Sequence, residues 1–269
     1  GLAGAACARA LADRGYRVHV LDAGHHPAAG ASGLPVGLVA PHASPDDSVI
    51  SRLSRAGVRA MRDAMQRLLR EGQDCGPATP KLLLASGLRD DATPIRPLRG
   101  QLSWGLMSAL PPEAHARLPA SPVNGHGCWV HNVATAEGPA WFAGSTFDRT
   151  RDTPECLDSD QTENLERVQT LLPELAPHLT TAFAHPCVRA WAAVRASVPD
   201  RLPMVGPVAD APDTPGATHG LWLCSAMGSR GLSLSVLCGE LLAAQWTGEP
   251  LPIEPPLARA LSSLRFAKP

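Results

Sequence analysis

The chain has 269 residues, of which 44% are hydrophobic, so one large or two small globular domains are expected. The formal net charge of −1 gives no argument for nucleic-acid binding from charge alone. No apolar run is long enough to span a membrane, and the seven cysteines form no C-x-x-C pair, so we expect a cytoplasmic protein with small buried thiols and no membrane contact.

The first 22 residues have the pattern of the second half of a dinucleotide-binding βαβ unit. Gly1-Leu2-Ala3-Gly4 opens a helix of small residues that ends at Gly15, and an apolar strand is predicted over residues 16–21. In such units the glycines let the backbone approach a pyrophosphate, and an acid about 20 residues further on binds the ribose. No strand and no further glycine precede Gly1, so we infer that the chain begins inside the motif. The predicted cofactor-binding residues here are Gly1, Leu2, Ala3, Gly4, Asp22 and Ala23.

A loop rich in Gly, Ala, Pro and His follows over residues 23–47, and loops of this length inside a domain are usually functional. Apolar residues at helical spacing then predict a helix from about residue 49 to Arg70. Its other face is rich in arginine: Arg52, Arg55, Arg59, Arg62 and Arg67. Such a face is more typical of a solvated helix than of a nucleic-acid stripe.

The middle of the chain is rich in predicted strands. Residues 81–87 form a short buried strand ending in Gly87, which suits a second close approach of the backbone to a cofactor. Further strands are predicted at residues 99–104, 127–133, 140–146 and 187–196, and a helix at 158–175.

The C-terminal part contains a second junction of strand, glycine turn and helix. An apolar strand over residues 220–227 runs through Gly228-Ser229-Arg230-Gly231 into a helix over 232–246. The N–H groups at such a helix start favour a negatively charged ligand group. We therefore predict an α/β fold with a Rossmann-like nucleotide-binding domain of residues 1–98 and 187–269. An antiparallel β-rich substrate domain of residues 99–186 is inserted into it.

Five segments carry a resemblance to a known family. They are GLAGAA…VHVLD at the start, GASG at 30–33, RGQLSW at 99–104, VRASVPDRLPMVG at 194–206 and GSRGLSLSVLCGELLA at 228–243. Together they resemble the D-amino-acid-oxidase-like flavoproteins, and within them the C-terminal oxidoreductase domain of the bifunctional tRNA 5-methylaminomethyl-2-thiouridine biosynthesis (MnmC) family. The resemblance implies FAD as the cofactor and a FAD-binding domain of the glutathione-reductase or D-amino-acid-oxidase type.

The resemblance also implies a reaction. Family members oxidise the carboxymethylaminomethyl group on the wobble uridine of tRNA and release the carboxymethyl arm as glyoxylate, and a separate methyltransferase domain precedes this one in the parent protein. Two alternatives stay open: a FAD-dependent oxidase of free small amino acids, of the glycine or sarcosine type, and a non-catalytic remnant of the fold. The family carries a longer segment near residues 74–81 and a first strand that this sequence lacks, and both differences bear on FAD binding.

The resemblance assigns roles to particular residues. Arg195 occupies the position of an arginine that binds the substrate carboxylate, with a surface arginine at a strand end as the alternative. Arg230 is expected to face the substrate or a backbone phosphate. Arg201 could bind the same substrate carboxylate, but we favour a structural role in which it pairs with Asp200. The remaining predicted FAD contacts around the pyrophosphate or flavin are Gly30, Ala31, Ser32 and Gly33, with a generic turn as the alternative. Those at the N1–O2 edge of the flavin are Gly228, Ser229, Arg230, Gly231 and Leu232, with a plain helix N-cap as the alternative.

Overall fold

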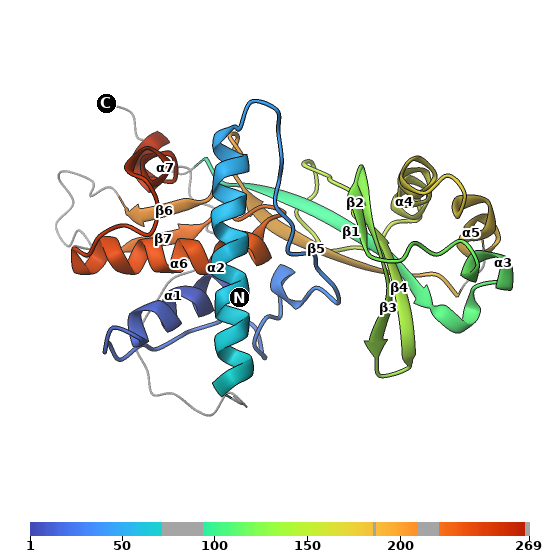
Figure 1. The fold of residues 1–269 in the computed structure, drawn as a ribbon, viewed down its shortest axis with the longest axis horizontal. Helices are drawn as coiled ribbons and strands as arrows, with labels where there is room; N and C mark the ends of the chain where they lie inside the picture. The colour runs from blue at the N-terminus through green and yellow to red at the C-terminus, as the bar shows by residue number, and fades with distance from the viewer. Residues whose placement is uncertain (72–93, 185–186, 209–220, 267–269) are drawn as a thin grey trace. The chain divides into compact units, whose positions relative to one another are not determined.

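The computed structural model describes residues 1–71, 94–184, 187–208 and 221–266 (Figure 1). The chain divides into two compact units. The first unit contains residues 1–33, 37–96 and 195–269, and the second contains residues 34–36 and 97–194. Each unit has a hydrophobic core of its own.

The first unit is built around the helix α6 (Gly231–Thr247). Helices α1 (Leu2–Ala12) and α2 (Val49–Glu71) both pack against it. The unit also contains a pair of antiparallel strands, β6 (Met204–Pro207) and β7 (Trp222–Ser225), the helix α7 (Pro255–Ala260) and two 3-10 turns, η1 (Ala31–Gly33) and η3 (Ser263–Phe266).

Glycines allow the close approach of α1 and α2 to α6. A Cβ on Gly239 of α6 would lie 2.7 Å from the carbonyl carbon of Ala6 in α1, and a Cβ on Gly57 of α2 would lie 2.1 Å from the carbonyl oxygen of Ser233. Both clashes are with backbone, which cannot rotate away. Because α6 is covered on more than one side, it is apolar around most of its circumference rather than amphipathic.

Three of the cysteines lie in this core. Cys7, Cys224 and Cys238 are fully buried, as predicted for small hydrophobic thiols. A hydrogen bond with Cys7 and burial together raise the pKa of the Cys224 thiol, and burial raises the pKa of the Cys238 thiol. The Cys224 and Cys238 thiols therefore stay protonated and act as packing groups. The prediction of buried thiols is wrong for Cys156, which is exposed, and Cys128 and Cys187 are half-buried.

The second unit is a sheet with helices on it. The strand order is β2-β3-β4-β1-β5, and the pairs β2–β3, β3–β4 and β1–β4 are antiparallel. The strands are β1 (Arg96–Leu106), β2 (Val123–Gly125), β3 (Gly127–Thr135), β4 (Gly138–Gly144) and β5 (Arg189–Ser197). The helical elements are η2 (Met107–Ala109), α3 (Pro112–His115), α4 (Asp158–Leu171) and α5 (Ala176–Phe183). In the core Trp129 stacks on Trp141 with ring centroids 5.2 Å apart.

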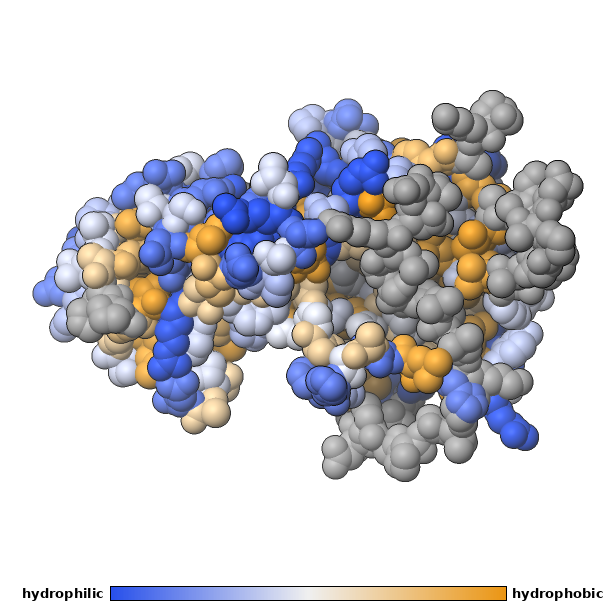
Figure 2. Space-filling model, turned by 180° about the vertical axis from the view of Figure 1, so that it is seen from behind, coloured by the Kyte–Doolittle hydropathy of each residue, from blue (hydrophilic) through white to orange (hydrophobic). Residues whose placement is uncertain are grey.

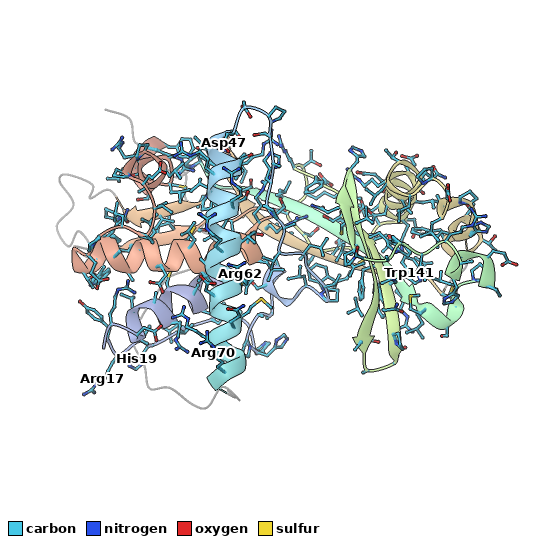
Figure 3. All side chains as sticks on the ribbon, in the orientation of Figure 1. Arg17, His19, Asp47, Arg62, Arg70 and Trp141 are labelled. Atoms are coloured by element: carbon cyan, nitrogen blue, oxygen red, sulfur yellow. The ribbon has the colours of Figure 1, made fainter. Side chains whose placement is uncertain are left out.

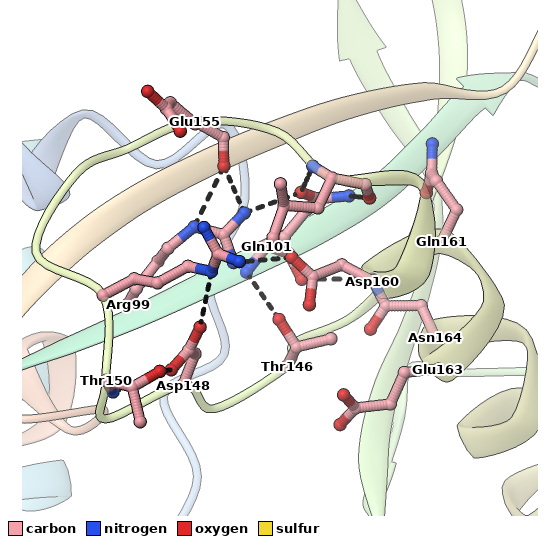
Figure 4. A network of polar contacts seen from close by, with 12 residues as sticks. Arg99, Gln101, Thr146, Asp148, Thr150, Glu155, Asp160, Gln161, Glu163 and Asn164 are labelled. Atoms are coloured by element: carbon pink, nitrogen blue, oxygen red, sulfur yellow. Dashed lines mark hydrogen bonds and ion pairs between the residues drawn. The ribbon is translucent and has the colours of Figure 1, made fainter.

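A buried polar network joins β1 to the start of α4 (Figure 4). Arg99 is 0% exposed, and its Nη1 donates to Asp160 Oδ2 at 2.5 Å while Nε donates to the Glu155 carbonyl at 2.9 Å. Gln101 accepts from Arg99 Nη2 at 3.0 Å and from the Leu157 N–H at 2.8 Å. Arg99 and Gln101 are alternate residues of the RGQLSW segment, and both hydrogen-bond to residues 155–160. The buried positive charge of Arg99 is paired with Asp160.

The structure corrects two predicted elements. Residues 16–21 form no strand and contain a β-bridge at Val20 alone. A strand needs a hydrogen-bonded neighbour along its length, and among the described residues this segment has only the single bridge at Val20. Val20 and Leu21 are accordingly 51% and 70% exposed. Exposed hydrophobic side chains are also visible on the face of the molecule shown in Figure 2.

The predicted helix over residues 158–175 is two helices. Pro173 has no N–H and its ring clashes with the preceding turn, so α4 ends at Leu171 and α5 begins at Ala176. The strand β6 and the helix α7 were not predicted, because prolines bound both. The predicted strand at 81–87, with Gly87, lies outside the described residues.

Candidate functional site

The N-terminus of α1 brings together three predicted cofactor segments. The Leu2 N–H donates to Ser32 Oγ at 3.0 Å, and a Cβ on Gly1 would lie 2.7 Å from the same oxygen. The Gly1 amine lies 3.4 Å from Asp22 Oδ2. The glycine start, the acid at position 22 and the 30–33 turn, which is the 3-10 turn η1, are therefore neighbours in space.

Asp22 is exposed and well placed to accept hydrogen bonds. The Gly24 N–H donates to its Oδ1 at 2.9 Å. This hydrogen bond is the largest cause that holds the pKa of Asp22 below its ordinary value of 3.8. The carboxylate is ionised at neutral pH, and an ionised carboxylate is an acceptor for the hydroxyl pair of a ribose. Ala23 beside it is also exposed.

The start of α6 lies next to the start of α1. A Cβ on Gly231 would lie 3.9 Å from Leu2 Cδ1. Gly228, with φ +53°, turns the chain from β7 into α6, and its N–H donates to the Ala196 carbonyl at 2.9 Å. The 228–232 turn therefore adjoins α1 on one side and the end of β5 on the other. Two helix starts, each with N–H groups that no helical carbonyl accepts, lie close together.

Three arginines belong to these turns. Arg195 lies at the end of β5 and is half-buried, and burial lowers the pKa of its guanidinium. Arg230 is also half-buried, and burial and the positive charge of Arg201 lower its pKa. Among the residues that the structure describes, neither Arg201 nor Arg230 has an acidic partner. Both guanidiniums remain charged at neutral pH, so this place favours an anion.

The predicted pairing of Arg201 with Asp200 is wrong. Arg265 takes that carboxylate instead, with Nε 2.8 Å from Asp200 Oδ2 and Nη2 3.0 Å from Oδ1. Arg201 has φ +60° in the turn, and its charge acts on Arg230. Arg201 was therefore assigned too small a role from the sequence. The adjacent Asp200 had made an ion pair within the turn the expected interaction.

The residues present fit a dinucleotide cofactor. A Cβ on Gly33 would lie 2.4 Å from the Ala28 carbonyl oxygen, and a Cβ on Gly24 would lie 2.6 Å from Ala29 Cβ, so the loop after Asp22 is folded tightly enough to need glycine. Backbone N–H groups at two helix starts and the carboxylate of Asp22 are the donors and acceptor that a pyrophosphate and a ribose require. Gly87 is not among the described residues and adds nothing to this fit.

The described ranges indicate neither a metal site nor a membrane-spanning helix. No group of three His, Cys, Asp or Glu residues there could hold a metal ion. In the same ranges no helix has both the length and the apolar character needed to cross a membrane.

Comparison with known proteins gives the family. The profile of the family described as DAO, FAD dependent oxidoreductase, matches residues 1–92 and 75–245. The two matched ranges overlap at residues 75–92, next to the position where a longer family segment is expected.

Two relatives illustrate the similarity. The tRNA 5-methylaminomethyl-2-thiouridine biosynthesis bifunctional protein MnmC of Paracidovorax citrulli is 38% identical over 384 residues, which cover 99% of this chain and 59% of the relative. The protein of the same name from Albidiferax ferrireducens is 36% identical over 359 residues, which cover 99% and 58%. The chain thus spans about 59% of the length of the first relative. The 384-residue alignment exceeds the 269 residues of the chain, so at least 115 residues of that relative have no counterpart here.

Solved structures resemble the chain at lower sequence identity than these two relatives. Glycine oxidase from Geobacillus kaustophilus has a TM-score of 0.47 and 18% identity, covering 65% of this chain and 40% of that one. Iminodiacetate oxidase from Chelativorans sp. BNC1 has a TM-score of 0.41 and 19% identity, covering 65% and 41%. The family match extends over most of the sequence and includes the segments that form the two helix starts. The chain therefore belongs to the DAO family of FAD-dependent oxidoreductases.

Proposed function

We propose that the chain is the oxidoreductase part of an enzyme that removes the carboxymethyl group of 5-carboxymethylaminomethyl-(2-thio)uridine at the tRNA wobble position. The observation that carries the proposal is the 38% identity, over 99% of the chain, to a bifunctional protein named for the synthesis of 5-methylaminomethyl-2-thiouridine. The cations beside the two helix starts support it, because the group to be removed ends in a carboxylate.

Bound FAD would supply the two-electron acceptor for oxidation of the CH2–N unit to an iminium, and hydrolysis of that iminium would release the arm as glyoxylate and leave an aminomethyl group on the base. We assign its pyrophosphate and ribose to Gly1, Leu2, Ala3, Gly4, Asp22 and the 30–33 turn. We assign its flavin to Gly228, Ser229, Arg230, Gly231 and Leu232. The N–H groups at the start of α6 stabilise negative charge that develops there.

Arg195 is the residue proposed to hold the substrate carboxylate. It is half-buried at the end of β5, and the next residue, Ala196, accepts the Gly228 N–H at 2.9 Å. A partly desolvated guanidinium binds a carboxylate more strongly than an exposed one. Arg230 adds a second cation from the start of α6. These groups position the reacting carbon, which is the main task of the protein in flavin chemistry.

Absorption spectroscopy tests the proposal. Purified chain is titrated with FAD, and the bound fraction is mixed without oxygen with tRNA that carries the carboxymethylaminomethyl group, with unmodified tRNA, or with free glycine or sarcosine. We expect flavin bleaching and one glyoxylate per flavin only with the modified tRNA. Bleaching by free glycine or sarcosine alone would instead identify a free amino-acid oxidase, and failure to bind FAD would identify a non-catalytic remnant.

A further inference from the structure

A groove lies in the first unit between α2 and the segment around α7. Its volume is about 540 Å³, which is within the range of small-ligand sites. One wall consists of arginines of α2, and the other of the segment from residue 251 to the first half of α7. The lining residues are Arg52, Arg55, Ala56, Arg59, Leu251, Pro252, Ile253, Glu254 and Leu257.

The arginines of the groove continue along α2. At 3.6 residues per turn the six arginines of the helix fall within an arc of about 140°, and they span roughly 27 Å from first to last. They are Arg52, Arg55, Arg59, Arg62, Arg67 and Arg70. The residues that α2 buries all lie outside this arc: Ser51, Leu53, Ser54, Gly57 and Met61. Figure 3 shows Arg62 and Arg70 spaced along the helix. We call this surface the arginine face.

The acids near the arginine face pair with it only weakly. Arg52 pairs with Glu254 and Arg55 with Asp47, while Arg62 Nε lies 3.7 Å from Asp63 and Arg67 Nη1 lies 3.9 Å from Asp13. These carboxylates are 34–64% exposed, and exposed pairs contribute about 0–1 kcal/mol. Arg59 is exposed and has no acidic partner in the described part of the chain. A phosphate can therefore replace these partners at little cost.

We propose that the arginine face binds the sugar-phosphate backbone of RNA, and that one nucleotide of the strand enters the groove. The proposal rests on the proposed function, which makes that RNA a tRNA. A small free anion would need only the groove, whereas the charge continues for four further turns of the helix beyond Arg55. The groove is lined by Arg52, Arg55 and Arg59 beside apolar residues. The plane of an arginine guanidinium is one of the surfaces on which an unstacked base of single-stranded RNA is held.

Fluorescence anisotropy with labelled tRNA, over a series of salt concentrations, tests the inference. The Arg59→Ala/Arg62→Ala double variant removes two charges from the arginine face. We expect it to bind tRNA roughly tenfold more weakly, since two exposed ionic contacts are lost. The slope of log affinity against log salt should shrink by about 2. The matched control, Arg117→Ala/Arg149→Ala, removes two exposed arginines of the second unit and should change affinity less than twofold.

A second variant is expected to strengthen tRNA binding instead of weakening it. Glu254→Gln removes the acid that faces the groove and occupies Arg52, so tRNA binding should tighten by roughly two- to fivefold at low salt. A merely structural role of the Arg52–Glu254 pair would leave affinity unchanged or lower it. FAD titration and urea unfolding of each variant verify that the fold is intact.

The outcomes separate the inference from the proposed function. Wild-type binding of tRNA with unchanged affinity in the double variant would overturn the inference and leave the function standing. No binding of tRNA by the wild-type chain would overturn both. Displacement of tRNA by polyglutamate as effective as displacement by polyuridylate, per charge, would assign the face to an acidic protein and overturn the inference.

Discussion

Arg99 in the second unit and the pair Arg201 and Arg230 in the first unit show two opposite uses of arginine. In the second unit Arg99 is 0% exposed, and its guanidinium donates to a carboxylate, a side-chain amide and a backbone carbonyl. In the first unit Arg201 and Arg230 lie close enough for the charge of one to lower the pKa of the other, and no described acid pairs with either. A fully paired arginine stabilises the fold, whereas adjacent arginines without acidic partners remain available to bind an anionic ligand.

The strongest test of this comparison is the Arg99→Met variant. Removing the cation leaves Asp160 buried and uncompensated, which should lower the free energy of unfolding by about 3–5 kcal/mol. Urea unfolding monitored by circular dichroism measures the loss. Arg149→Met, at an exposed position of the same unit, is the control and should stay within about 0.5 kcal/mol.

Should the Arg99→Met chain fail to fold, Asp160→Asn gives a milder test. The amide still accepts the hydrogen bond from Nη1, which spans 2.5 Å in the wild type, but it no longer pairs the charge. We expect a loss of about 1–3 kcal/mol. A loss below 0.5 kcal/mol in both variants would show that the network is not what stabilises the second unit.

The first unit depends instead on close helix packing. In Gly239→Ala the new Cβ meets the backbone of Ala6 and Cys7 at 2.7–2.9 Å, so α1 must move away from α6. We expect a loss of about 1–3 kcal/mol in the free energy of unfolding and weaker FAD binding, because the two helix starts would separate. Gly30→Ala has no atom within 4 Å of its Cβ, and it is the matched control for stability. Equal stability of the two variants would contradict the packing argument.

Much of this architecture follows from local sequence patterns. Helical spacing gave α2, the glycine turn at 228–231 gave the start of α6, and alternation gave β1, β3 and β4, because those patterns depend on residues near in sequence. Residues 16–21 also have the composition of a strand, but strand formation depends on a neighbour that the local pattern does not reveal. Pro173 should have divided the helix predicted over 158–175, since its consequence is local.

The candidate site was predictable to a similar extent. The glycine spacing and the acid at position 22 were enough to predict that residues 1–4 and Asp22 lie together. The contact of Ser32 with the Leu2 N–H joins positions 30 residues apart, and it came from family resemblance rather than spacing. The Arg265–Asp200 pair joins positions 65 residues apart, and no local rule could have preferred it to the adjacent Arg201.

The Arg230→Met variant tests the other half of the comparison. Because it removes a like charge beside Arg201, the free energy of unfolding should stay within about 0.5 kcal/mol or rise slightly. The KM for the modified tRNA should increase by roughly tenfold, the value of about 1.4 kcal/mol of lost ion pairing. Steady-state kinetics and urea unfolding of the same preparation measure both, with Arg149→Met as the control. A clear loss of stability at unchanged KM would group Arg230 with Arg99.

The smallest effect concerns pH and the turn that carries Arg201. Burial raises the pKa of Asp200, but hydrogen bonds from Arg265 and the Leu202 N–H outweigh it, so the pKa lies below its ordinary value of 3.8. Since the folded state favours the carboxylate, its contribution is complete above the unfolded pKa and is lost as the pH falls through the lower, folded pKa.

Between pH 5 and pH 3 the wild-type chain should therefore lose about 1 kcal/mol more stability than Asp200→Asn, as measured by urea unfolding across that range. Asp63→Asn, which changes an exposed acid 3.7 Å from Arg62, should follow the wild-type curve. The Asp200–Arg265 pair also fixes the turn in which Arg201 holds φ +60°. Asp200→Asn should accordingly raise the KM for the modified tRNA by a few-fold at pH 7, and parallel pH curves with an unchanged KM would show that the pair does not position Arg201.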